Sequence, residues 1–238
     1  MPEPSTYAQN EIIDAALAVI DDQAASDVLP STRAVAARSH RARNTAVGAF
    51  RPATHHSVLR HLASSSSSLR TPAGVFAHDD VIRRVEFLGD VLPATRPEMV
   101  LVLVRQLSVR HFHNLAADDR GLRRRLLFTA AAMSRDASSS ADDEVRDDFA
   151  DALRMFYAGL DDRYVERYEE LLRRWGKEVI PSLDMRQLTR TLTALADGLL
   201  LRYSVDDDST LDAAAETYGA AAEAILVSMI TPAVVPHA

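Results

Sequence analysis

The 238-residue sequence contains no cysteine, a single tryptophan, only eight glycines and no long apolar run. The absence of cysteine excludes a disulfide framework, a thiolate nucleophile and a zinc–thiolate site. No apolar stretch approaches the roughly 18 residues that a membrane-spanning helix requires, and the first residues lack the basic and apolar regions of a secretory signal. These absences predict a cytoplasmic protein without membrane contact.

Alanine and leucine are abundant instead, and 47% of the residues are hydrophobic, which is enough to bury a sizeable core. Because apolar residues recur at helical spacing and strand-like alternation is nearly absent, the sequence predicts an all-α fold. Beyond residue 75, helices are predicted over 79–92, 97–116, 121–134, 142–180, 184–203 and 210–230. The run Met99–Val104 has the composition of a buried strand, but its surroundings favour a central helix that is apolar on every side.

Charge is distributed unevenly along the chain, whose formal net charge is −7. Between Asp27 and Asp79 there are seven arginines and no acidic residue, whereas the rest of the chain carries 20 basic and 34 acidic residues. A basic block within an acidic protein is typical of a surface that binds a polyanion such as a nucleic acid. A solvated arginine-rich face would have the same composition, so charge alone leaves both interpretations open.

The basic block overlaps three short helical patterns. Apolar residues recur at helical spacing over 12–20, and Pro30 ends that segment. A short helix is then predicted over 33–39, a tight turn near 40–42, and a further short helix over 43–50. Two short helices joined by a tight turn are the layout of a helix-turn-helix, whose second helix enters the major groove of DNA.

Local signals set the limits of this domain. Ser31 or Thr32 is suited to cap the first helix of the pair. The serine run at 64–68 is typical of a surface connection. We therefore predict a helix-turn-helix DNA-binding domain over residues 1–62 and a helical ligand-binding and dimerisation domain over residues 63–238.

At these residues the sequence resembles the TetR family of bacterial transcription regulators. The matching residues are Ile13, Ala15, Ala16 and Leu17 in the first helix, Val35, Ala36, Arg38, Arg43, Thr45 and Phe50 in the helix pair, and Leu195–Arg202 in the second-last helix. The resemblance implies a cytoplasmic regulator that binds an operator as a homodimer and is released by a small-molecule effector. Val35, Ala36 and Phe50 are expected in the core, and Arg38 is as well suited to a role within the domain as to DNA contact.

The chain departs from the family pattern at three places. His40 occupies the turn position where the family usually has glycine, so it must accept a left-handed backbone or reshape the turn, at a cost of roughly 1 kcal/mol. Val47 and Ala49 replace the family's aromatic pair, of which a tyrosine commonly contacts phosphate, and the usual lysine after the helix is missing. These departures affect the affinity for DNA more than the fold.

The polar residues that remain in the helix pair can still contact DNA. Arginine bridges guanine O6 and N7, asparagine bridges adenine N6 and N7, and the amides at a helix N-terminus suit a phosphate. The predicted DNA-binding residues are Thr32, Arg33, Arg41, Arg43, Asn44, Thr45, Arg51 and His55.

The remainder of the chain resembles the family's effector domain, which implies a mostly apolar cavity with a few polar groups. The predicted lining residues are Phe87, Met99, Leu103, Gln106, Phe128, Met133, Phe149, Phe156 and Trp175. Taken singly, a side chain of this kind more often belongs to an ordinary core than to a ligand site. No cofactor and no metal site is predicted.

The last two helices carry apolar seams whose residues recur in steps of three and four. Such seams are suited to pair with a second copy in a four-helix bundle. The predicted interface residues are Leu188, Leu192, Leu195, Leu199, Leu211, Tyr218, Ile225 and Met229. The alternative is that both seams face the protein's own core.

Catalytic chemistry is the weaker interpretation. Asp147–Asp151 reads as the DDxxD motif that holds magnesium and diphosphate in helical isoprenoid enzymes, but acidic residues at the start of a long helix also offset its dipole. His111 and His113 diverge on a helix and chelate a metal poorly. The sequence therefore predicts a ligand-responsive transcriptional regulator, a repressor, and no enzyme. The alternative is a dimeric ligand-binding or protein-interaction module with a decayed DNA reader.

Overall fold

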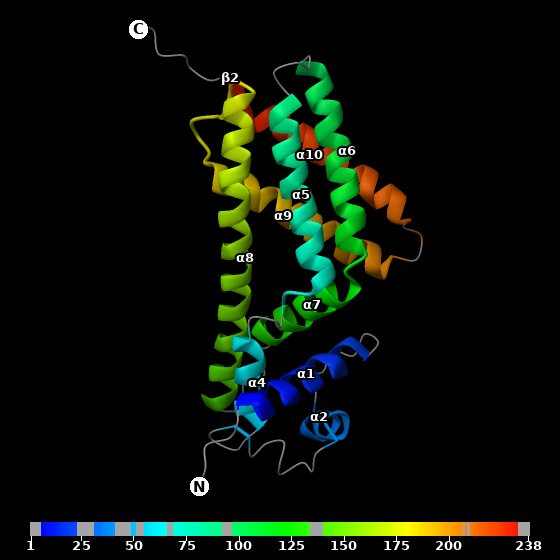
Figure 1. Cartoon of the computed structure of the whole chain (residues 1–238), viewed down its shortest axis with the longest axis vertical. Coiled ribbons are helices and arrows are strands. Elements are labelled where there is room, and N and C mark those ends of the chain that lie inside the picture. The colour runs from blue at the N-terminus through cyan, green and yellow to red at the C-terminus, as the bar shows by residue number, and fades with distance from the viewer. Residues whose placement is uncertain are drawn as a thin grey trace. The chain divides into compact units, whose positions relative to one another are not determined.

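In a computed structural model of the chain, the residues described are 6–22, 31–40, 49–50, 55–65, 69–91, 97–133, 140–206, 208 and 210–232 (Figure 1). They form the helices α1 (Thr6–Asp22), α2 (Thr32–Arg38), α4 (His55–Ser64), α5 (Pro72–Val91), α6 (Pro97–Ala116), α7 (Asp119–Met133), α8 (Ser140–Arg174), α9 (Met185–Val205) and α10 (Leu211–Met229), and the strands β1 (Lys177–Val179) and β2 (Ile230–Pro232). The prediction of an all-α fold is confirmed. Among the described helices, none combines the length and the apolar composition that a bilayer span requires.

Helix ends follow local chemistry. Ser31 caps α2 by accepting a hydrogen bond from Ala34 N at 3.2 Å. Asp184 and Gln187 form a reciprocal capping box at the start of α9. Helix α5 begins at Pro72, earlier than the predicted start at residue 79, because proline is compatible with the first turn of a helix.

The two short strands are a departure from the predicted helices. Helix α8 ends at Arg174 rather than near residue 180, and Gly176 follows with a left-handed φ of 65°, a conformation that glycine adopts without steric cost. The chain then forms β1, which pairs antiparallel with β2 in the register Lys177 with Pro232 and Val179 with Ile230.

Packing divides the chain into two units. Unit 1 comprises Met1–Thr71 and Asp119–Tyr157, and unit 2 comprises Pro72–Asp118 and Ala158–Ala238. This division differs from the predicted boundary between residues 62 and 63, because α7 and the first half of α8 pack with the N-terminal helices.

The core of unit 1 explains this grouping. Phe128 of α7 and Phe149 of α8 are fully buried and meet edge to face, with their ring centroids 4.6 Å apart. They belong to the same apolar cluster as Ile12, Phe50 and Leu62. The N-terminal helices therefore share one hydrophobic core with residues more than a hundred positions away along the chain.

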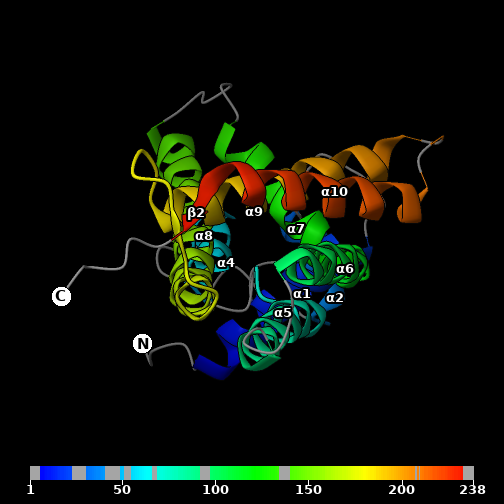
Figure 2. The ribbon, with the colours of Figure 1, turned by 90° about the horizontal axis from the view of Figure 1, so that it is seen from above.

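Unit 2 consists of α5, α6, the second half of α8, α9 and α10, and Figure 2 shows α9 and α10 side by side. Helix α10 also packs closely on α6, where a Cβ added at Gly219 would lie 2.5 Å from Val109 Cγ2. Gly219 thus permits a close helix approach within the chain. Met99 and Val102 on α6 are 47% and 45% exposed, so this helix is not apolar on every side as predicted.

Candidate functional site

The N-terminal helix pair begins as the sequence predicts. Val35, Ala36 and Phe50 are buried, which confirms their expected place in the core. Helix α2 ends in a turn at His40, whose φ of 53° lies in the left-handed region. The turn therefore keeps the backbone conformation that glycine normally supplies, and a histidine side chain bears its steric cost.

The predicted DNA-binding residues are only partly described. Arg33 lies on α2 and is exposed. Thr32 is the first residue of α2, and His55 is the first residue of α4. The remaining predicted residues, Arg41, Arg43, Asn44, Thr45 and Arg51, lie outside the described residues, so their contacts remain a prediction.

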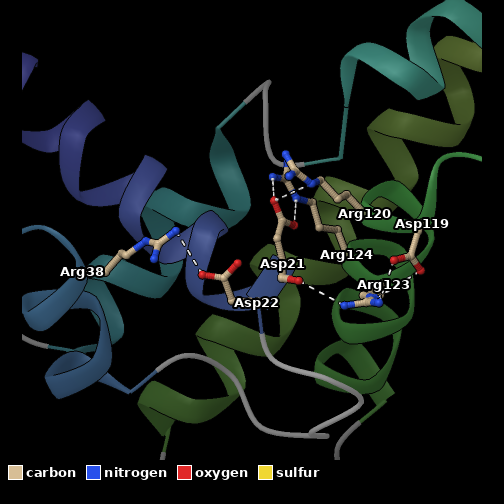
Figure 3. Close-up of polar contacts among 7 residues, drawn as sticks. All are labelled: Asp21, Asp22, Arg38, Asp119, Arg120, Arg123 and Arg124. Atoms are coloured by element: carbon tan, nitrogen blue, oxygen red, sulfur yellow. Dashed lines mark hydrogen bonds and ion pairs between the residues drawn. The ribbon is translucent and has the colours of Figure 1, made fainter.

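Arg38 has a partner inside unit 1. Its guanidinium lies 3.0 Å from the carboxylate of Asp22 at the end of α1, and both side chains are more than half exposed (Figure 3). This ion pair joins α1 to α2 and is consistent with the intradomain role considered for Arg38. An exposed pair of this kind contributes little to stability, about 0–1 kcal/mol.

A more buried cluster joins α1 to α7 (Figure 3). Arg124 donates two hydrogen bonds to the carboxylate of Asp21, at 2.9 and 2.7 Å, and the two side chains are only 10% and 9% exposed. Arg120 lies 4.0 Å from the same carboxylate, and Arg123 donates to the backbone carbonyl of Asp21 at 3.1 Å. Sequence reasoning did not find this cluster, because no pattern links residues that are 103 positions apart.

The acidic run on α8 also pairs with arginine. Arg60 of α4 donates to Asp148 at 2.8 Å and to Glu144 at 2.9 Å, and Asp151 pairs with Arg154. Of the DDxxD carboxylates, Asp148 thus joins α8 to α4, whereas Asp151 pairs within α8. The described residues contain no group of three acidic or histidine side chains placed to hold a metal ion.

Unit 2 contains a cavity of about 60 Å³. Its lining comes from α5, α6, α8, α9 and α10 and consists of Val81, Val85, Leu88, Val104, Leu107, Ser108, His111, Tyr168, Leu171, Leu172, Leu188, Leu192, Tyr218, Ala222 and Leu226. These side chains include no carboxylate, ammonium or guanidinium. The only polar groups that they bring to the cavity are a serine hydroxyl, an imidazole and two phenol hydroxyls.

The nine predicted ligand residues lie elsewhere. Phe87, Met99, Gln106 and Met133 are exposed. Phe128, Phe149 and Phe156 belong to unit 1 and pack in or against its core. Leu103 and Trp175 pack against the apolar clusters of unit 2 without lining the cavity. The cavity wall is built mainly from leucine and valine, which a sequence does not distinguish from ordinary core, and the nine ligand contacts remain a prediction.

The titratable groups of the cavity wall are electrically neutral near pH 7. Burial lowers the pKa of His111 from 6.5 to about 4, although a backbone hydrogen bond at Ala77 and the charge of Asp80 act in the opposite direction. Burial raises the pKa of Tyr168 to about 12, and burial raises that of Tyr218 still further. The described lining residues therefore present dipoles and no fixed charge to the cavity.

The apolar seams of α9 and α10 divide between two roles. Leu188, Leu192 and Tyr218 line the chain's own cavity, as the alternative interpretation expected. The other predicted interface residues, Leu195, Leu199, Leu211, Ile225 and Met229, are half-buried.

A second stripe on the same two helices is exposed. It consists of Thr191, Ala194, Gly198, Leu201 and Val205 on α9, and of Ala213, Thr217, Ala220, Ala224 and Val227 on α10. Both sets recur in steps of three and four residues. A Cβ added at Gly198 would meet no atom within 4 Å. Small side chains at this spacing leave the surface open to close approach by another helix pair.

Similarity to known proteins is confined to structure. No family model matches the sequence, and no curated protein shows significant similarity to it. A TetR-family transcriptional regulator from Rhodococcus sp. superposes with a TM-score of 0.52 at 14% identity, over 93% of this chain and 99% of that one. At this level of identity the likeness concerns the fold alone, which is TetR-like.

Two further solved structures are also similar along most of their length. The fatty acid degradation regulator FadR from Bacillus halodurans has a TM-score of 0.47 at 18% identity, over 92% of this chain and 96% of that one. NalD from Pseudomonas aeruginosa, the secondary repressor of a multidrug efflux pump, has a TM-score of 0.48 at 16% identity, over 96% of this chain and 98% of that one.

Proposed function

We propose that this chain, whose fold is TetR-like, is a homodimeric and ligand-responsive DNA-binding transcriptional regulator that acts as a repressor. The observation that carries the proposal is the helix pair of unit 1. Helix α2 ends in the left-handed turn at His40, and the sequence continues directly into a segment with Arg41, Arg43, Asn44 and Thr45. That order of elements, in the one basic block of an acidic chain, is what a helix-turn-helix requires.

The proposed readout follows from side-chain chemistry. Arg43 and Thr45 contact base edges in the major groove, and Arg33, exposed on α2, contacts the phosphate backbone. The buried pair of Asp21 and Arg124 supports the readout by fixing α1, the helix on which α2 packs, to α7. The segment that reads DNA is thus carried by a unit with its own core and ion pairs.

The homodimer is proposed to form through the exposed stripe on α9 and α10. Two copies of this small-residue stripe form a four-helix bundle, and the two-fold axis of the dimer presents two readers to an inverted-repeat operator. The effector is proposed to occupy the cavity of unit 2. Helix α8 contributes Tyr168 and Leu171 to the cavity and Phe149 to the core of unit 1. Because the helix is continuous, a shift caused by a bound effector would displace residues in both units.

Substitutions test the proposed function directly. Arg43→Ala and Thr45→Ala are expected to weaken binding to an operator selected from genomic DNA by about tenfold or more, because each removes a base contact, and to leave the melting temperature nearly unchanged. Arg154→Ala is the matched control, because it removes an exposed arginine whose ion-pair partner is Asp151. Equal binding by all three variants would contradict the proposed reader.

Ala220→Arg is expected to yield monomers in light scattering, and a dimer that survives it would contradict the proposed interface.

A second candidate function is a dimeric ligand-binding or interaction module without specific DNA binding. Ala49 favours it, because this residue is buried in unit 1 where the family has an aromatic residue near phosphate. Stable dimers that bind a ligand and no DNA at low salt would support this second function.

A further inference from the structure

The cavity of unit 2 is smaller than a ligand that contains even one ring. Its volume is about 60 Å³, whereas an apolar cavity that takes up benzene measures roughly 150 Å³. If an organic effector binds in this cavity, at least one helix of the wall has to move outward. The contacts of the five lining helices indicate which helix moves.

Four of these helices are packed closely on one another. Helix α6 is in close backbone contact with α5 and with α10, and α10 is in close contact with α9. Between α6 and α10, a Cβ added at Gly219 would lie 3.1 Å from the backbone oxygen of Arg105. Among the described helices of unit 2, α8 takes part in none of these close pairs, although it contributes Tyr168, Leu171 and Leu172 to the cavity wall. Helix α8 can therefore move without breaking a close helix contact.

The edge of α8 that faces α5 is held by exposed ion pairs. These are Asp79 with Arg163, Glu86 with Arg167 at 3.3 Å, and Asp90 with Arg174 at 2.7 Å. Each of the six side chains is 40% or more exposed. Ion pairs in this setting contribute little to stability, because water and salt screen them. This edge is therefore held weakly.

The edge of α8 that faces α9 is held more firmly. The side chain of Asp161 is only 5% exposed, and its carboxylate accepts a hydrogen bond from Arg190 at 2.8 Å. Arg186 pairs with the neighbouring Asp162 and lies 3.7 Å from Asp161. Separation of α8 from α9 would leave a buried carboxylate without its partner, which costs far more than the loss of an exposed pair. This edge is therefore suited to act as a hinge.

A buried hydrogen bond limits movement at one end of the edge with α5. The imidazole of His78 on α5 and the hydroxyl of Tyr164 on α8 share this bond, and both side chains are buried. The cavity residues of α8 lie beyond this bond, toward the end of the helix at Arg174. There the side chain of Arg174 lies on α5, where a Cβ added at Gly89 would be 3.2 Å from Arg174 Cδ. The weakly held stretch is thus the one that lines the cavity.

We propose that residues 164–174 of α8 form a lid over the cavity of unit 2. The lid swings away from α5, which breaks the exposed pairs of Arg167 and Arg174, and turns about its edge with α9. The opening admits an uncharged, apolar ligand that is larger than the closed cavity. The proposal rests on the effector role proposed above for this cavity and adds the route by which the effector enters.

Bridging either edge of the lid tests the proposal, because the chain has no cysteine of its own. Glu86→Cys with Arg167→Cys places a cysteine pair on the edge with α5, and Asp162→Cys with Arg186→Cys places one on the edge with α9. Each full-length variant is bridged with bismaleimidoethane, and a sample capped with N-ethylmaleimide serves as its unbridged reference. The probe is N-phenyl-1-naphthylamine, an uncharged apolar compound whose fluorescence rises in apolar surroundings, and stopped-flow mixing measures its association rate.

The two bridges should act differently on the association rate. We expect the bridge to α5 to slow association about tenfold or more, and the bridge to α9 to change it by less than about twofold, because only the first holds the lid closed. Equal rates in the two bridged forms, slower entry with the α9 bridge alone, or no binding to the unaltered chain would overturn the proposal. Binding that survives Leu107→Trp, which fills the cavity, would place the probe elsewhere and also overturn it.

Two neighbouring arginines provide a matched pair of variants without cross-linking. Arg174→Gln removes a pair that crosses to α5, whereas Arg173→Gln removes a pair with Glu170 within α8. We expect Arg174→Gln to raise the association rate by about threefold, as the loss of one exposed ion pair allows, and Arg173→Gln to leave it unchanged. Equal rates for the two variants would overturn the assignment of the weak edge. Circular dichroism melting checks that both variants fold.

A parallel assay separates the lid from the proposed function. Genomic DNA fragments retained by the protein are titrated with N-phenyl-1-naphthylamine under the same conditions. Probe entry that the α5 bridge blocks but that releases no DNA would refute the effector role and leave the lid standing. DNA release by a probe that enters both bridged forms at the same rate would refute the lid and leave the effector role standing.

Discussion

The buried ion pair of unit 1 and the cavity wall of unit 2 contain polar groups of opposite kinds. In unit 1 the nearly buried side chain of Arg124 donates two hydrogen bonds to the carboxylate of Asp21. In unit 2 the described side chains of the cavity wall are neutral, and Nδ1 of His111 makes no hydrogen bond. Paired charges fix one arrangement of helices, whereas neutral side chains around a cavity impose no such pairing. The comparison therefore separates a charged contact that joins two helices of unit 1 from a cavity wall in unit 2 whose described side chains carry no charge.

The largest expected effect is the loss of the buried ion pair in unit 1. Arg124→Met leaves the carboxylate of Asp21 buried without its main partner, and we expect it to lower the free energy of unfolding by about 3–5 kcal/mol. Urea denaturation monitored by circular dichroism measures this change. Arg154→Met, which breaks the exposed pair with Asp151, serves as the control and should cost about 0–1 kcal/mol. Similar losses in both variants would remove the distinction drawn for unit 1.

The second effect concerns pH and unit 2. The pKa of His111 falls from 6.5 in the unfolded chain to about 4 when folded, so between these values the unfolded state binds more protons. Stability from this group is complete above pH 6.5 and is lost as the pH falls toward 4, by about 3 kcal/mol in all. His111→Leu should therefore show a weaker decline in the free energy of unfolding over this interval than the unaltered chain. Parallel declines would mean that His111 is not buried as described.

The third effect tests the close contact between α6 and α10 in unit 2. Gly219→Ala places a methyl group 2.5 Å from Val109 Cγ2, and overpacking of this kind costs about 1–3 kcal/mol. Val109→Ala in the same chain should recover most of that loss, because it removes the opposing methyl groups. A double variant as unstable as the single one would place the strain elsewhere.

The smallest effect concerns the turn of unit 1. His40→Gly relieves a left-handed backbone at a non-glycine residue and should raise the free energy of unfolding by about 0.5–1 kcal/mol. Ser39→Gly, one residue earlier at an ordinary φ of −81°, should have the opposite sign, because glycine adds flexibility there without relieving strain. Destabilisation by both substitutions would show that the turn at His40 is unstrained.

The sequence predicted those parts of the molecule that depend on local chemistry. The apolar spacing predicted α6, α9 and α10 nearly to their ends. The family resemblance left a left-handed backbone or a reshaped turn open at His40, and the structure has the former. The short strand at Lys177–Val179 was missed because three residues are too few to show alternation.

Contacts between residues that lie far apart in the sequence could not be predicted from local patterns. Helical spacing identifies an apolar face but not what covers it, so Leu188 and Leu192 were assigned to a partner subunit when they line the chain's own cavity. The pairing of Asp21 with Arg124 depends on the folded positions of α1 and α7, and no pattern in the sequence predicts it. The cavity was missed for the same reason, because it lies where several helices leave space between ordinary leucines and valines.

Salt dependence of DNA binding tests the central claim most directly. Affinity of the unaltered chain for mixed genomic DNA fragments is measured by fluorescence anisotropy between about 50 and 200 mM salt. A dimer that neutralises several phosphates should lose affinity by orders of magnitude across this interval. Affinity that does not change with salt, or no binding at the lowest concentration, would contradict the claim that unit 1 reads DNA.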